Sequence, residues 1–454
     1  MNNTFNNNDN ICAISSPNGT GGVSLIRISG NEAIEITQKL FSKNINDAKG
    51  YSVHYGSIFE NNKNEIDQVI VTIFKSPNSF TGENTAEINC HGSIFIQQKI
   101  IELLIQNGAR IAEAGEFSQR AFLNGKMDLS QTEAIADLIH ATSSEAHKIA
   151  INQMKGGFSN ELKQLREQLI EFASLVELEL DFAEEDVEFA DRKQLNNLLN
   201  KLENHINDLK SSFKYGNAIK NGVETVIAGR PNSGKSTLLN NLLNDERAIV
   251  SSIPGTTRDT IEEMININGI DFRLVDTAGI RNTSDQVEKM GVEKTFQKIN
   301  TSSILIYLYD VSKTNKDEVK KDLEKFRGLE IPTIVIANKI DLLEVTKDVP
   351  NKHVKLSAIK DGESEIIKDK IYQLFIQQKI KSEGVIITNL RHYEALENAN
   401  NELQKVKAGL DNNLSGDFLA MDIRQVLQHI GSITGDISSD ELLGNIFANF
   451  CIGK

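Results

Sequence analysis

Cysteine is scarce in this chain: Cys12, Cys90 and Cys451 are the only three, they lie far apart, and none belongs to a C-x-x-C pair. Such usage argues against a disulfide framework and a structural zinc site, and it is typical of a reducing cytosol. The neighbours Cys90 and His91 make a poor metal site, because adjacent residues on a strand face opposite ways. Ordinary packing is the default interpretation of Cys90.

Long apolar runs are also missing. The longest, "SILIYLY", has the size of a strand and falls well short of the roughly 18 residues that a membrane span needs. The opening "MNNTFNNNDN" has neither the basic and apolar regions of a signal peptide nor the Arg-rich character of a transit peptide. We therefore expect a cytoplasmic protein that begins with a short disordered tip.

A prenylation signal is absent as well, although Cys451 is the fourth residue from the C-terminus in "CIGK". Gly453 and Lys454 do not fit the aliphatic and terminal positions of such a box. The cysteine is then either a reactive group or filler, and the rest of the chain has to decide.

Positive charge is in deficit: 63 Asp and Glu against 49 Lys and Arg give a formal net charge of −14. Because phosphate backbones attract cationic surfaces, an acidic protein is a poor indiscriminate binder of nucleic acid. If the protein acts on RNA, it needs a local basic patch or a partner that carries the RNA.

The length of 454 residues suggests two to four domains. The pattern of predicted helices and strands differs between successive segments of the chain. Up to about residue 125 the pattern is mixed α/β, with strands at "GGVSLIRIS" and "DQVIVTIF" and a helix ended by Gly108. A helical segment follows to about residue 217. It has a predicted capping box of Ser130 with Glu133, and later apolar residues at helical spacing from Leu162 to Leu180.

Residues 218–380 alternate short apolar strands with helices, which is the βαβ rhythm of a parallel sheet covered on both faces. One hairpin interrupts this rhythm, with a tight turn predicted at Asn268-Gly269. Helical texture returns in residues 381–454. The economical interpretation is a helical domain split in two by an inserted α/β domain.

A phosphate-binding loop opens the inserted domain. "GRPNSGKST" matches G-x-x-x-x-G-K-[ST] after the first strand, where backbone N–H groups cradle phosphates and Lys235 neutralises them. The hydroxyl of Ser236 is the predicted Mg²⁺ ligand in this loop. A strand before the loop and a helix after it make a plain glycine-rich turn an unlikely alternative.

Two further motifs follow in order. "DTAG" begins at Asp276, whose carboxylate can hold Mg²⁺ through water, and its Gly279 can meet the γ-phosphate. "NKID" ends a later strand, and the Asp341 carboxylate can accept from both N–H groups on the edge of guanine. "SA" at Ser357 closes the base pocket. This ordered set resembles the GTPases among P-loop proteins.

The residues predicted to contact GTP are Asn232, Ser233, Gly234, Lys235, Ser236, Thr237, Ser251, Ser252, Ile253, Pro254, Gly255, Thr256, Thr257, Asp276, Thr277, Ala278, Gly279, Asn338, Lys339, Asp341, Ser357 and Ala358.

Water activation is not explained by these motifs. Ras-type enzymes use a Gln after this glycine, but Ile280 stands here and cannot hydrogen-bond water. Thr257 in "SSIPGTTRD" is the natural switch hydroxyl for Mg²⁺. Arg258 beside it is either a built-in arginine finger or a solvated loop residue, and the residues alone do not decide.

Motifs from the whole chain resemble one family. "GRPNSGKS", "GTTRD", "DTAGIR", "FTGE", "GEFSQRAFLNGKMDL", "QTEAIADLI" and "FCIGK" are similar to the MnmE (TrmE) family of tRNA modification GTPases, from about residue 11 to 454. The resemblance implies an N-terminal folate-binding-type domain, 1–125, that also dimerises. It further implies a discontinuous helical domain, 126–217 and 381–454, and an inserted Ras-like GTPase domain, 218–380.

For hydrolysis, the resemblance implies a homodimer whose GTPase domains meet around K⁺, with Lys235 in the catalytic set. Glu288 in "DQVEKMG" reads by itself as a surface carboxylate, and the resemblance makes it the residue that directs water. Ser251 stands where we expect Thr, which is harmless whether the ligand is the backbone carbonyl or the hydroxyl. The implied K⁺ shell is Asn232, Ser251, Ile253 and Thr256.

A second site is implied in the N-terminal domain. Strand alternation places Arg27 on one face with Val23 and Leu25, where an unpaired charge is costly, so either an internal salt bridge or a ligand must supply an anion. The resemblance implies a pocket for 5-formyl- or methylene-tetrahydrofolate. An Arg suits the folate carboxylate and a Glu suits the donor edge of a pterin. The matching residues are Arg27, Glu87, Lys126 and Lys454.

The implied function is GTP hydrolysis that drives tRNA modification. The product carries a (carboxymethyl)aminomethyl-type group at carbon 5 of the wobble uridine, and the flavin protein MnmG (GidA) is the implied partner, supplying much of the tRNA-binding surface. "CIGK" becomes a segment packed against the other domains, with Cys451 as a catalytic candidate. The alternative is a ribosome-assembly GTPase switch. The N-terminal domain, the tail and the lack of an obvious GXXG-type RNA module argue against it.

Overall fold

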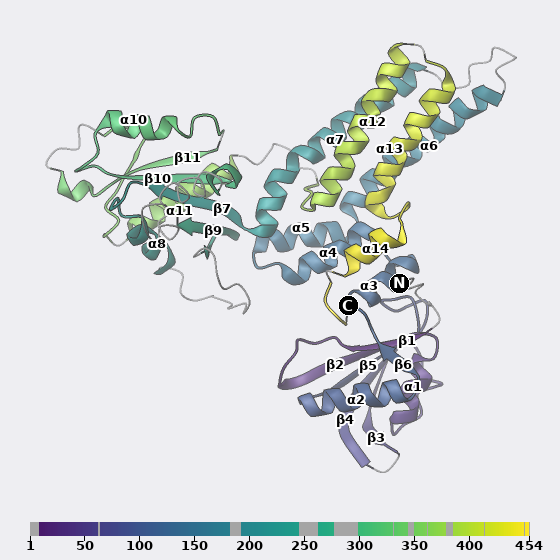
Figure 1. Cartoon of the computed structure of the whole chain (residues 1–454). Helices are drawn as coiled ribbons and strands as arrows, with labels where there is room; N and C mark the ends of the chain where they lie inside the picture. Colours follow the sequence, from purple (N-terminus) through teal and green to yellow (C-terminus); the bar gives the residue numbers. More distant parts are fainter. Residues whose placement is uncertain are drawn as a thin grey trace, which may run out of the picture. The chain divides into compact units, whose positions relative to one another are not determined.

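The computed structural model of the chain describes residues 9–61, 64–181, 192–244, 262–276, 298–329, 331–343, 349–360, 362–377, 385–412, 414–448 and 450–453. Contacts group the chain into two units, each described by itself below (Figure 1). The first unit comprises residues 1–139, 153–173 and 424–454, and the second comprises 140–152 and 174–423.

A six-stranded sheet begins the first unit, in the order β3-β4-β5-β2-β1-β6. Its pairs are antiparallel except β1 with β6. Ile26 and Ile28 of β2 point into a core that is covered by α1 and α2, so the intervening Arg27 faces the other side. The bounds are β1 Asn10–Ile14, β2 Gly21–Ser29, α1 Ala33–Leu40, β3 Ser52–Glu60, β4 Asn64–Phe74, β5 Thr85–Gly92, α2 Ile94–Gln106 and β6 Ala109–Ile111.

Helices complete the first unit, and some of them continue into the second. Leu129, Leu443 and Phe447 form a small buried cluster that brings the beginning of α4 next to α14. The bounds are α3 Glu116–Leu123, α4 Leu129–His140, α5 Ser144–Met154, α6 Gly157–Asp181, α13 Gly416–Thr434 and α14 Asp440–Phe447.

The capping box of α4 differs from the prediction. Asp128, not Ser130, precedes the helix: its carboxylate accepts the N–H of Gln131 at 3.0 Å, and the Gln131 side chain accepts the N–H of Asp128 at 3.0 Å. The hydroxyl of Ser130 instead pairs with Ser159 and Asp128. Asp is as good a helix cap as Ser, and the helix begins at Leu129, two residues earlier than a cap at Ser130 predicts.

The second unit contains a long helix pair and a second six-stranded sheet. Apolar side chains of α7, Arg192–Asn221, are buried along the side that packs on α12, Leu390–Asp411. The sheet order is β12-β11-β10-β7-β9-β8, parallel except for the edge strand β8. Its bounds, with the covering helices, are β7 Val223–Gly229, α8 Lys235–Asn244, β8 Glu262–Ile267, β9 Ile270–Asp276, β10 Ile304–Asp310, α10 Lys316–Glu324, β11 Thr333–Asn338, the 3₁₀ turn Ile340–Leu342, β12 Val354–Lys355 and α11 Glu363–Ile376.

The predicted mixed α/β chain with long helices is confirmed, and so is the hairpin. Asn268 and Gly269 both have positive φ, 51° and 82°, as a two-residue turn between β8 and β9 requires. Within the ranges given above, none of the helices combines the length and hydrophobicity of a membrane crossing.

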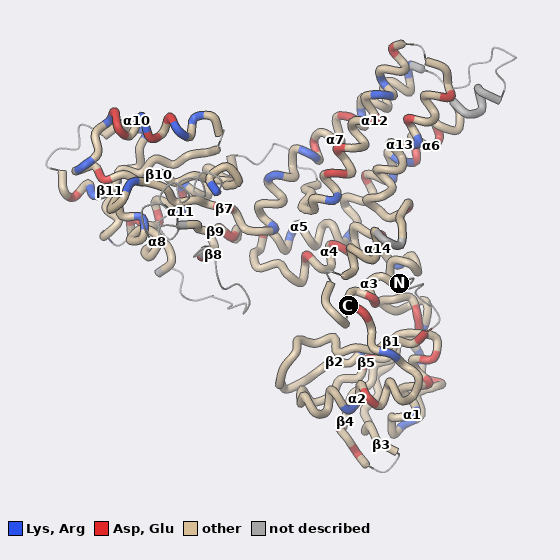
Figure 2. The backbone as a smooth tube through the Cα atoms, in the orientation of Figure 1, with Lys and Arg blue, Asp and Glu red and all other residues tan. Residues whose placement is uncertain are grey.

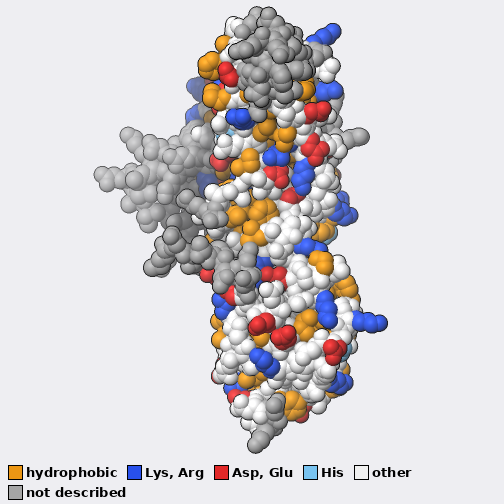
Figure 3. Space-filling view, turned by 90° about the vertical axis from the view of Figure 1, so that its right-hand side faces the viewer, with side chains coloured by type: hydrophobic (Ala, Val, Ile, Leu, Met, Phe, Trp, Pro, Cys, Tyr) orange, Lys and Arg blue, Asp and Glu red, His pale blue; other side chains and the backbone are white. Residues whose placement is uncertain are grey.

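Charge is finely mixed along the backbone. Lys and Arg alternate with Asp and Glu along α10 and along the long helices (Figure 2). One space-filling face likewise shows both signs interspersed with apolar side chains (Figure 3). On the face shown, the described Lys and Arg side chains are not gathered into one patch of the kind that attracts a phosphate backbone.

Candidate functional site

The loop between β7 and α8 has the geometry of a phosphate cradle. Gly229 and Gly234 have φ of 154° and 100°. A Cβ on Gly229 would lie 2.1 Å from the Leu308 carbonyl oxygen, and one on Gly234 would lie 2.3 Å from the Asn338 side-chain nitrogen. Only glycine fits both positions, so the loop backbone stays exposed to a ligand.

Polar groups of this loop match what a phosphate needs. The ammonium of Lys235 donates to the carbonyls of Gly229 and Arg230 at 3.1 Å each, which holds it over the loop. The hydroxyl of Ser233 is buried and has no hydrogen-bond partner among the described residues. Ser236 and Thr237 lie in the first turn of α8. The residues present therefore fit a bound nucleoside phosphate with Mg²⁺ on Ser236.

Asn338 joins the phosphate loop to the base loop. Its side-chain nitrogen donates to the Ser233 carbonyl at 2.8 Å, and its side-chain oxygen accepts the N–H of Ala358 at 2.8 Å. The hydroxyl of Ser357 donates to Asp341 at 2.5 Å, which orients that carboxylate. The structure thus brings the predicted "GKS", "NKID" and "SA" residues together at the carboxyl edge of the sheet.

Lys339 stabilises the phosphate-binding loop through a hydrogen bond to its backbone. Its ammonium donates to the Asn232 carbonyl at 2.8 Å and to the Asp310 carboxylate at 2.7 Å. Burial by itself raises the pKa of Asp310, but hydrogen bonds from Lys339 and Ser312 hold that pKa below its usual value. Asp310 is therefore charged at neutral pH and fixes Lys339 under Asn232.

Two supports of the base loop were not predicted. Glu363, in the first turn of α11, accepts the N–H of Ser357 at 2.8 Å. Asn241 of α8 donates to the carbonyl of Ala358. An acidic first-turn residue after "SA" was the available signal for Glu363, whereas no local pattern indicates Asn241.

A further unpredicted contact fixes the other end of the phosphate loop. Arg230 donates to Asp322 at 2.7 Å and to Glu318 at 2.8 Å, both on α10. The two carboxylates raise the pKa of Arg230, and Tyr307 also donates to Asp322 at 2.8 Å. Charge-assisted hydrogen bonds to two separate carboxylates are stronger than neutral ones, and they fix the position of the guanidinium.

Several predicted residues lie outside the described ranges. They comprise the switch positions, including the proposed Mg²⁺ ligand and arginine finger, the end of "DTAG", the water-directing acid and the last residue. They are Ser251, Ser252, Ile253, Pro254, Gly255, Thr256, Thr257, Arg258, Thr277, Ala278, Gly279, Ile280, Glu288 and Lys454.

In the N-terminal domain, Arg27 has an internal partner. Its Nε and Nη2 donate to Glu87 at 2.9 and 2.8 Å. The guanidinium also lies 5.3 Å from the ring centroid of Phe80 and 5.6 Å from that of Phe117. The salt bridge joins two residues predicted to bind the same ligand, and both side chains keep partial exposure.

Lys126 lies against the same loop as Arg27. Its ammonium donates to the Pro77 carbonyl at 2.9 Å, and its side chain lies beside Gly82. Phe80, which contacts Arg27, belongs to this loop. Residues 77–82 therefore connect the two cations.

The C-terminal segment packs on this domain. The Ser15 hydroxyl donates to the Gly453 carbonyl at 2.9 Å, and the Gly115 N–H donates to the Cys451 carbonyl at 3.3 Å. Ile452 forms an antiparallel bridge with Ala114. Because the Ser15 N–H pairs with the strand of Arg27 at Leu25, the segment ends near that strand.

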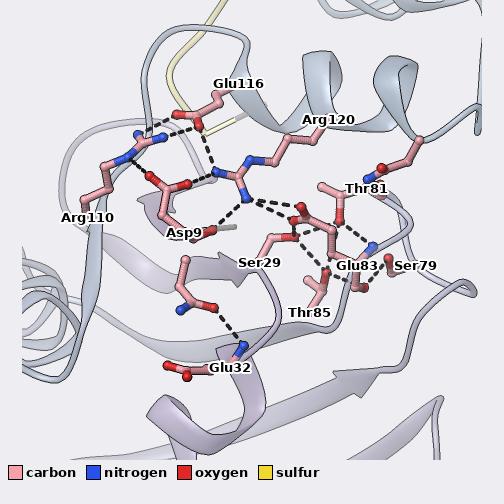
Figure 4. Close-up of polar contacts among 12 residues, drawn as sticks. Asp9, Ser29, Glu32, Ser79, Thr81, Glu83, Thr85, Arg110, Glu116 and Arg120 are labelled. Carbon is pink, nitrogen blue, oxygen red and sulfur yellow. Dashed lines mark hydrogen bonds and ion pairs between the residues drawn. The ribbon is translucent and has the colours of Figure 1, made fainter. Parts of the chain in front are cut away.

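An ion network around the buried side chains of Arg120 and Glu116 fixes α3 (Figure 4). Arg120 is 4% exposed and bonds Asp9, Glu83 and Glu116, while Arg110 bonds Asp9 and Glu116. Burial alone raises the pKa of Glu116, but Arg110 and the Glu113 N–H hold it below its usual value. These charges satisfy one another, so the network serves to orient α3.

The three cysteines differ in access. Cys12 and Cys90 are buried, and burial raises the pKa of both thiols to about 11, which makes them inert. Cys451 is exposed. His91 points away from Cys90 and bonds Asp67 at 2.7 Å, as strand alternation predicts.

Known proteins resemble this chain over its whole length. A family model described as the MnmE helical domain matches residues 129–451, and one described as the GTP-binding protein TrmE N-terminus matches residues 10–126. A tRNA modification GTPase MnmE from Cytophaga hutchinsonii is 50% identical, covering 99% of this chain and 98% of that protein. The protein of the same name from Flavobacterium johnsoniae is also 50% identical, covering 99% and 100%.

Among solved structures, a variant of Era from Aquifex aeolicus bound to GDP and aluminium fluoride is 25% identical. The match covers 39% of this chain and 66% of that one, with a TM-score of 0.27.

Proposed function

Because this chain belongs to the MnmE family of tRNA modification GTPases, we propose that it hydrolyses GTP as a step in tRNA modification. The modification adds a (carboxymethyl)aminomethyl-type group at carbon 5 of the wobble uridine. The carbon comes from 5-formyl- or methylene-tetrahydrofolate. The observation that carries this proposal beyond plain GTP hydrolysis is the C-terminal segment held beside the strand of Arg27.

The nucleotide site supplies the hydrolase half. Asp341 selects guanine, and Lys235 and the loop N–H groups bind the phosphates. Mg²⁺, held by Ser236 and Thr257, neutralises phosphate charge when bound. Glu288 directs water, since Ile280 offers no hydrogen bond.

The N-terminal pocket supplies the one-carbon half. The pair of Arg27 and Glu87 can open toward a ligand that offers both a carboxylate and a donor edge, as folate does. Lys126 and Lys454 add cations for the remaining acidic groups. The exposed Cys451 lies on the same segment as Lys454 and is the nucleophile candidate.

Dimerisation is supported by the uncovered face of the N-terminal sheet. Val53 and Tyr55 of β3 are 65% and 58% exposed, and Ile70 of β4, which pairs with Tyr55, is 44% exposed. Adjacent apolar side chains on one face of a sheet are stabilised by burial, and we propose a second copy of this chain as the cover.

The remaining partners follow from charge. The flavin protein MnmG (GidA) carries much of the tRNA-binding surface, which reconciles modification of RNA with a net charge of −14. Three cysteines without a disulfide suit a cytoplasmic location.

Nucleoside analysis of tRNA from cells that lack this protein tests the proposal. We expect the modified wobble uridine to disappear and to return with the intact gene. The same cells with unchanged nucleosides but accumulated ribosome precursors would favour the ribosome-assembly alternative. A flavin-coloured partner that co-purifies with the protein would support the role in tRNA modification, whereas co-purifying ribosomal subunits would support the ribosome-assembly alternative.

Hydrolysis is expected to need K⁺, with Na⁺ a poor substitute. The cation supplies positive charge where an arginine finger would act, and such charge is worth about 10³-fold or more in rate. Asn232→Ala should bind GTP but lose the K⁺ response in a steady-state assay. Asn232 has φ of 60°, so Asn232→Gly, which removes the amide without backbone strain, should behave alike.

Asn232→Asp keeps an oxygen ligand and tolerates the same backbone, so it is the matched control and should retain K⁺ stimulation. Activity that is independent of K⁺ but collapses in Arg258→Ala would assign the role to the arginine instead.

Glu288→Ala should bind GTP normally and hydrolyse it about 10²-fold or more slowly, because a positioned acid–base group typically contributes that much. Single-turnover hydrolysis at saturating K⁺ measures the effect. Glu324→Ala, which removes an exposed acid on α10, is the control. Near-normal hydrolysis by Glu288→Ala would return this residue to an ordinary surface role.

A further inference from the structure

The β8–β9 hairpin lies between the two switch motifs. "GTTRD" ends three residues before β8, and "DTAG" begins with the last residue of β9. Any displacement of these segments with the nucleotide therefore pulls on one or both strands of the hairpin.

The turn of the hairpin is bonded to the beginning of α5. The N–H of Glu145 donates to the Gly269 carbonyl at 3.1 Å, and the Ser144 hydroxyl approaches the same oxygen at 3.4 Å. Glu145 lies in the first turn of α5, where N–H groups have no partner within the helix. The hairpin turn thus supplies an acceptor to the beginning of this helix.

A second bond to the hairpin is made two residues after Gly269, at Asp271 of β9. The Thr142 hydroxyl donates to one oxygen of Asp271 at 2.5 Å, and the Asn266 side chain donates to the other at 2.6 Å. The side-chain oxygen of Asn266 in turn accepts the N–H of Gly269 at 3.1 Å. Asp271 is 8% exposed, so its carboxylate is largely screened from water.

Packing reinforces the junction. Ala146 and Ile149 of α5 lie against the core that contains Ile265 of β8 and Phe272 of β9. At its other end α5 reaches Met154, whose carbonyl accepts from the side chain of Gln131 at 3.0 Å. One helix is therefore bonded to the hairpin at its start and to α4 at its end.

We propose that this junction transmits the nucleotide state of the GTPase domain to the helical segment, with Thr142 and Asp271 as positioning residues. This inference rests on the proposed function, in which hydrolysis drives modification. A displaced turn must either carry α5 with it or break the Glu145 and Thr142 bonds. Either way, the contacts at the beginning of α5 differ between nucleotide states, and α5 is bonded to α4 at its other end.

The test is uncoupling. Thr142→Val keeps the size of the side chain but removes the donor to Asp271, and Asp271→Ala removes the acceptor. Each variant, as the full chain, is assayed for GTP hydrolysis and for restoration of the wobble modification in cells lacking the protein. We expect kcat and KM for GTP within about twofold of wild type and modification reduced about 5- to 150-fold, the usual range of coupling between sites.

Two further variants separate signal from damage. Thr225→Val removes another buried hydroxyl bond, 3.2 Å long, in β7 and should leave both readouts unchanged. Asp271→Asn keeps an oxygen for Thr142 and should restore most of the modification. Hydrogen exchange at the Glu145 amide should differ between GDP and a non-hydrolysable GTP analogue in wild type, and this difference should shrink in Thr142→Val.

The inference fails if Thr142→Val and Asp271→Ala both modify tRNA at the wild-type level, or if hydrolysis falls in parallel with modification. Equal exchange of Glu145 in the two nucleotide states would also overturn it. The outcome for the proposed function is separate: if the wild-type gene does not restore modification, that proposal fails first.

Discussion

Asp341→Asn is expected to turn the protein from a GTPase into a xanthosine triphosphatase. In the proposed site the wild-type carboxylate accepts two N–H groups on the guanine edge, and xanthine replaces the amino group of that edge with a carbonyl. An amide can donate to that carbonyl, whereas a carboxylate repels it. Sites built to hydrogen-bond one edge reject the mismatched analogue by about 10⁴- to 10⁵-fold, so we expect the ratio of kcat/KM for the two nucleotides to shift by about 10⁴.

The contacts around Asp341 indicate that this substitution leaves the rest of the base pocket unchanged. Ser357 holds the carboxylate through its hydroxyl at 2.5 Å, and that donor remains available to the amide oxygen of Asn. Asn338 holds the loops together independently of Asp341. The substitution therefore alters one hydrogen-bonding edge and leaves the pocket assembled.

Competition between the two nucleotides in one reaction measures the switch. Ser357→Ala is the matched control, because it loosens Asp341 without changing the edge offered to the base. It should weaken both nucleotides and leave the preference for GTP. A preference for GTP that survives in Asp341→Asn would sink the assignment of this residue.

The strands around this pocket could be predicted because each follows a local rule. β7 and β10 are continuous apolar runs of the length that a doubly covered parallel strand requires, and their ends carry the motif residues. The pair Asn268-Gly269 by itself predicts a two-residue hairpin turn. In these places propensity, pattern and turn chemistry all indicate the same structure.

The supports of the pocket could not be predicted for the opposite reason. Arg230 bonds Glu318 and Asp322 across about ninety positions of sequence, and the sequence alone does not favour them over the two other acids of α10, Asp317 and Glu324. Asn241 reaches the Ala358 carbonyl from another helix. Such bonds depend on how helices and strands pack on one another, and the local spacing of residues in the sequence does not predict this packing. The ion pairs of Arg120 with Asp9 and Glu83 could not be predicted for the same reason.

Deletion of residues 451–454 is expected to abolish wobble-uridine modification while leaving GTP binding and K⁺-stimulated hydrolysis within about twofold of wild type. The segment is bonded to the N-terminal domain at Ser15, Ala114 and Gly115. The described nucleotide-site contacts all come from the other unit. Folate binding should weaken as well if Lys454 is a folate ligand, as proposed above.

Loss of stability is a poor explanation for such a result. The deletion removes two hydrogen bonds and one bridge, each worth about 0.5–1.5 kcal/mol, while the aromatic pair of Phe447 and Phe450 stays in place. A thermal melt of the variant checks this. The hypothesis is falsified if the deletion variant still modifies tRNA at the wild-type level.

Point variants then separate position from chemistry within the segment. Gly453 has φ of 94°, and a Cβ there would lie 2.4 Å from the Ile14 carbonyl oxygen, so Gly453→Ala should displace the segment and reproduce the deletion with every functional group retained. Cys451→Ser keeps the size but is a far poorer nucleophile. If Cys451→Ser loses modification and keeps folate binding, the thiol acts in the chemistry or in docking. If it loses both, the exposed sulfur contributes packing in the assembled complex, and the catalytic assignment of Cys451 is wrong.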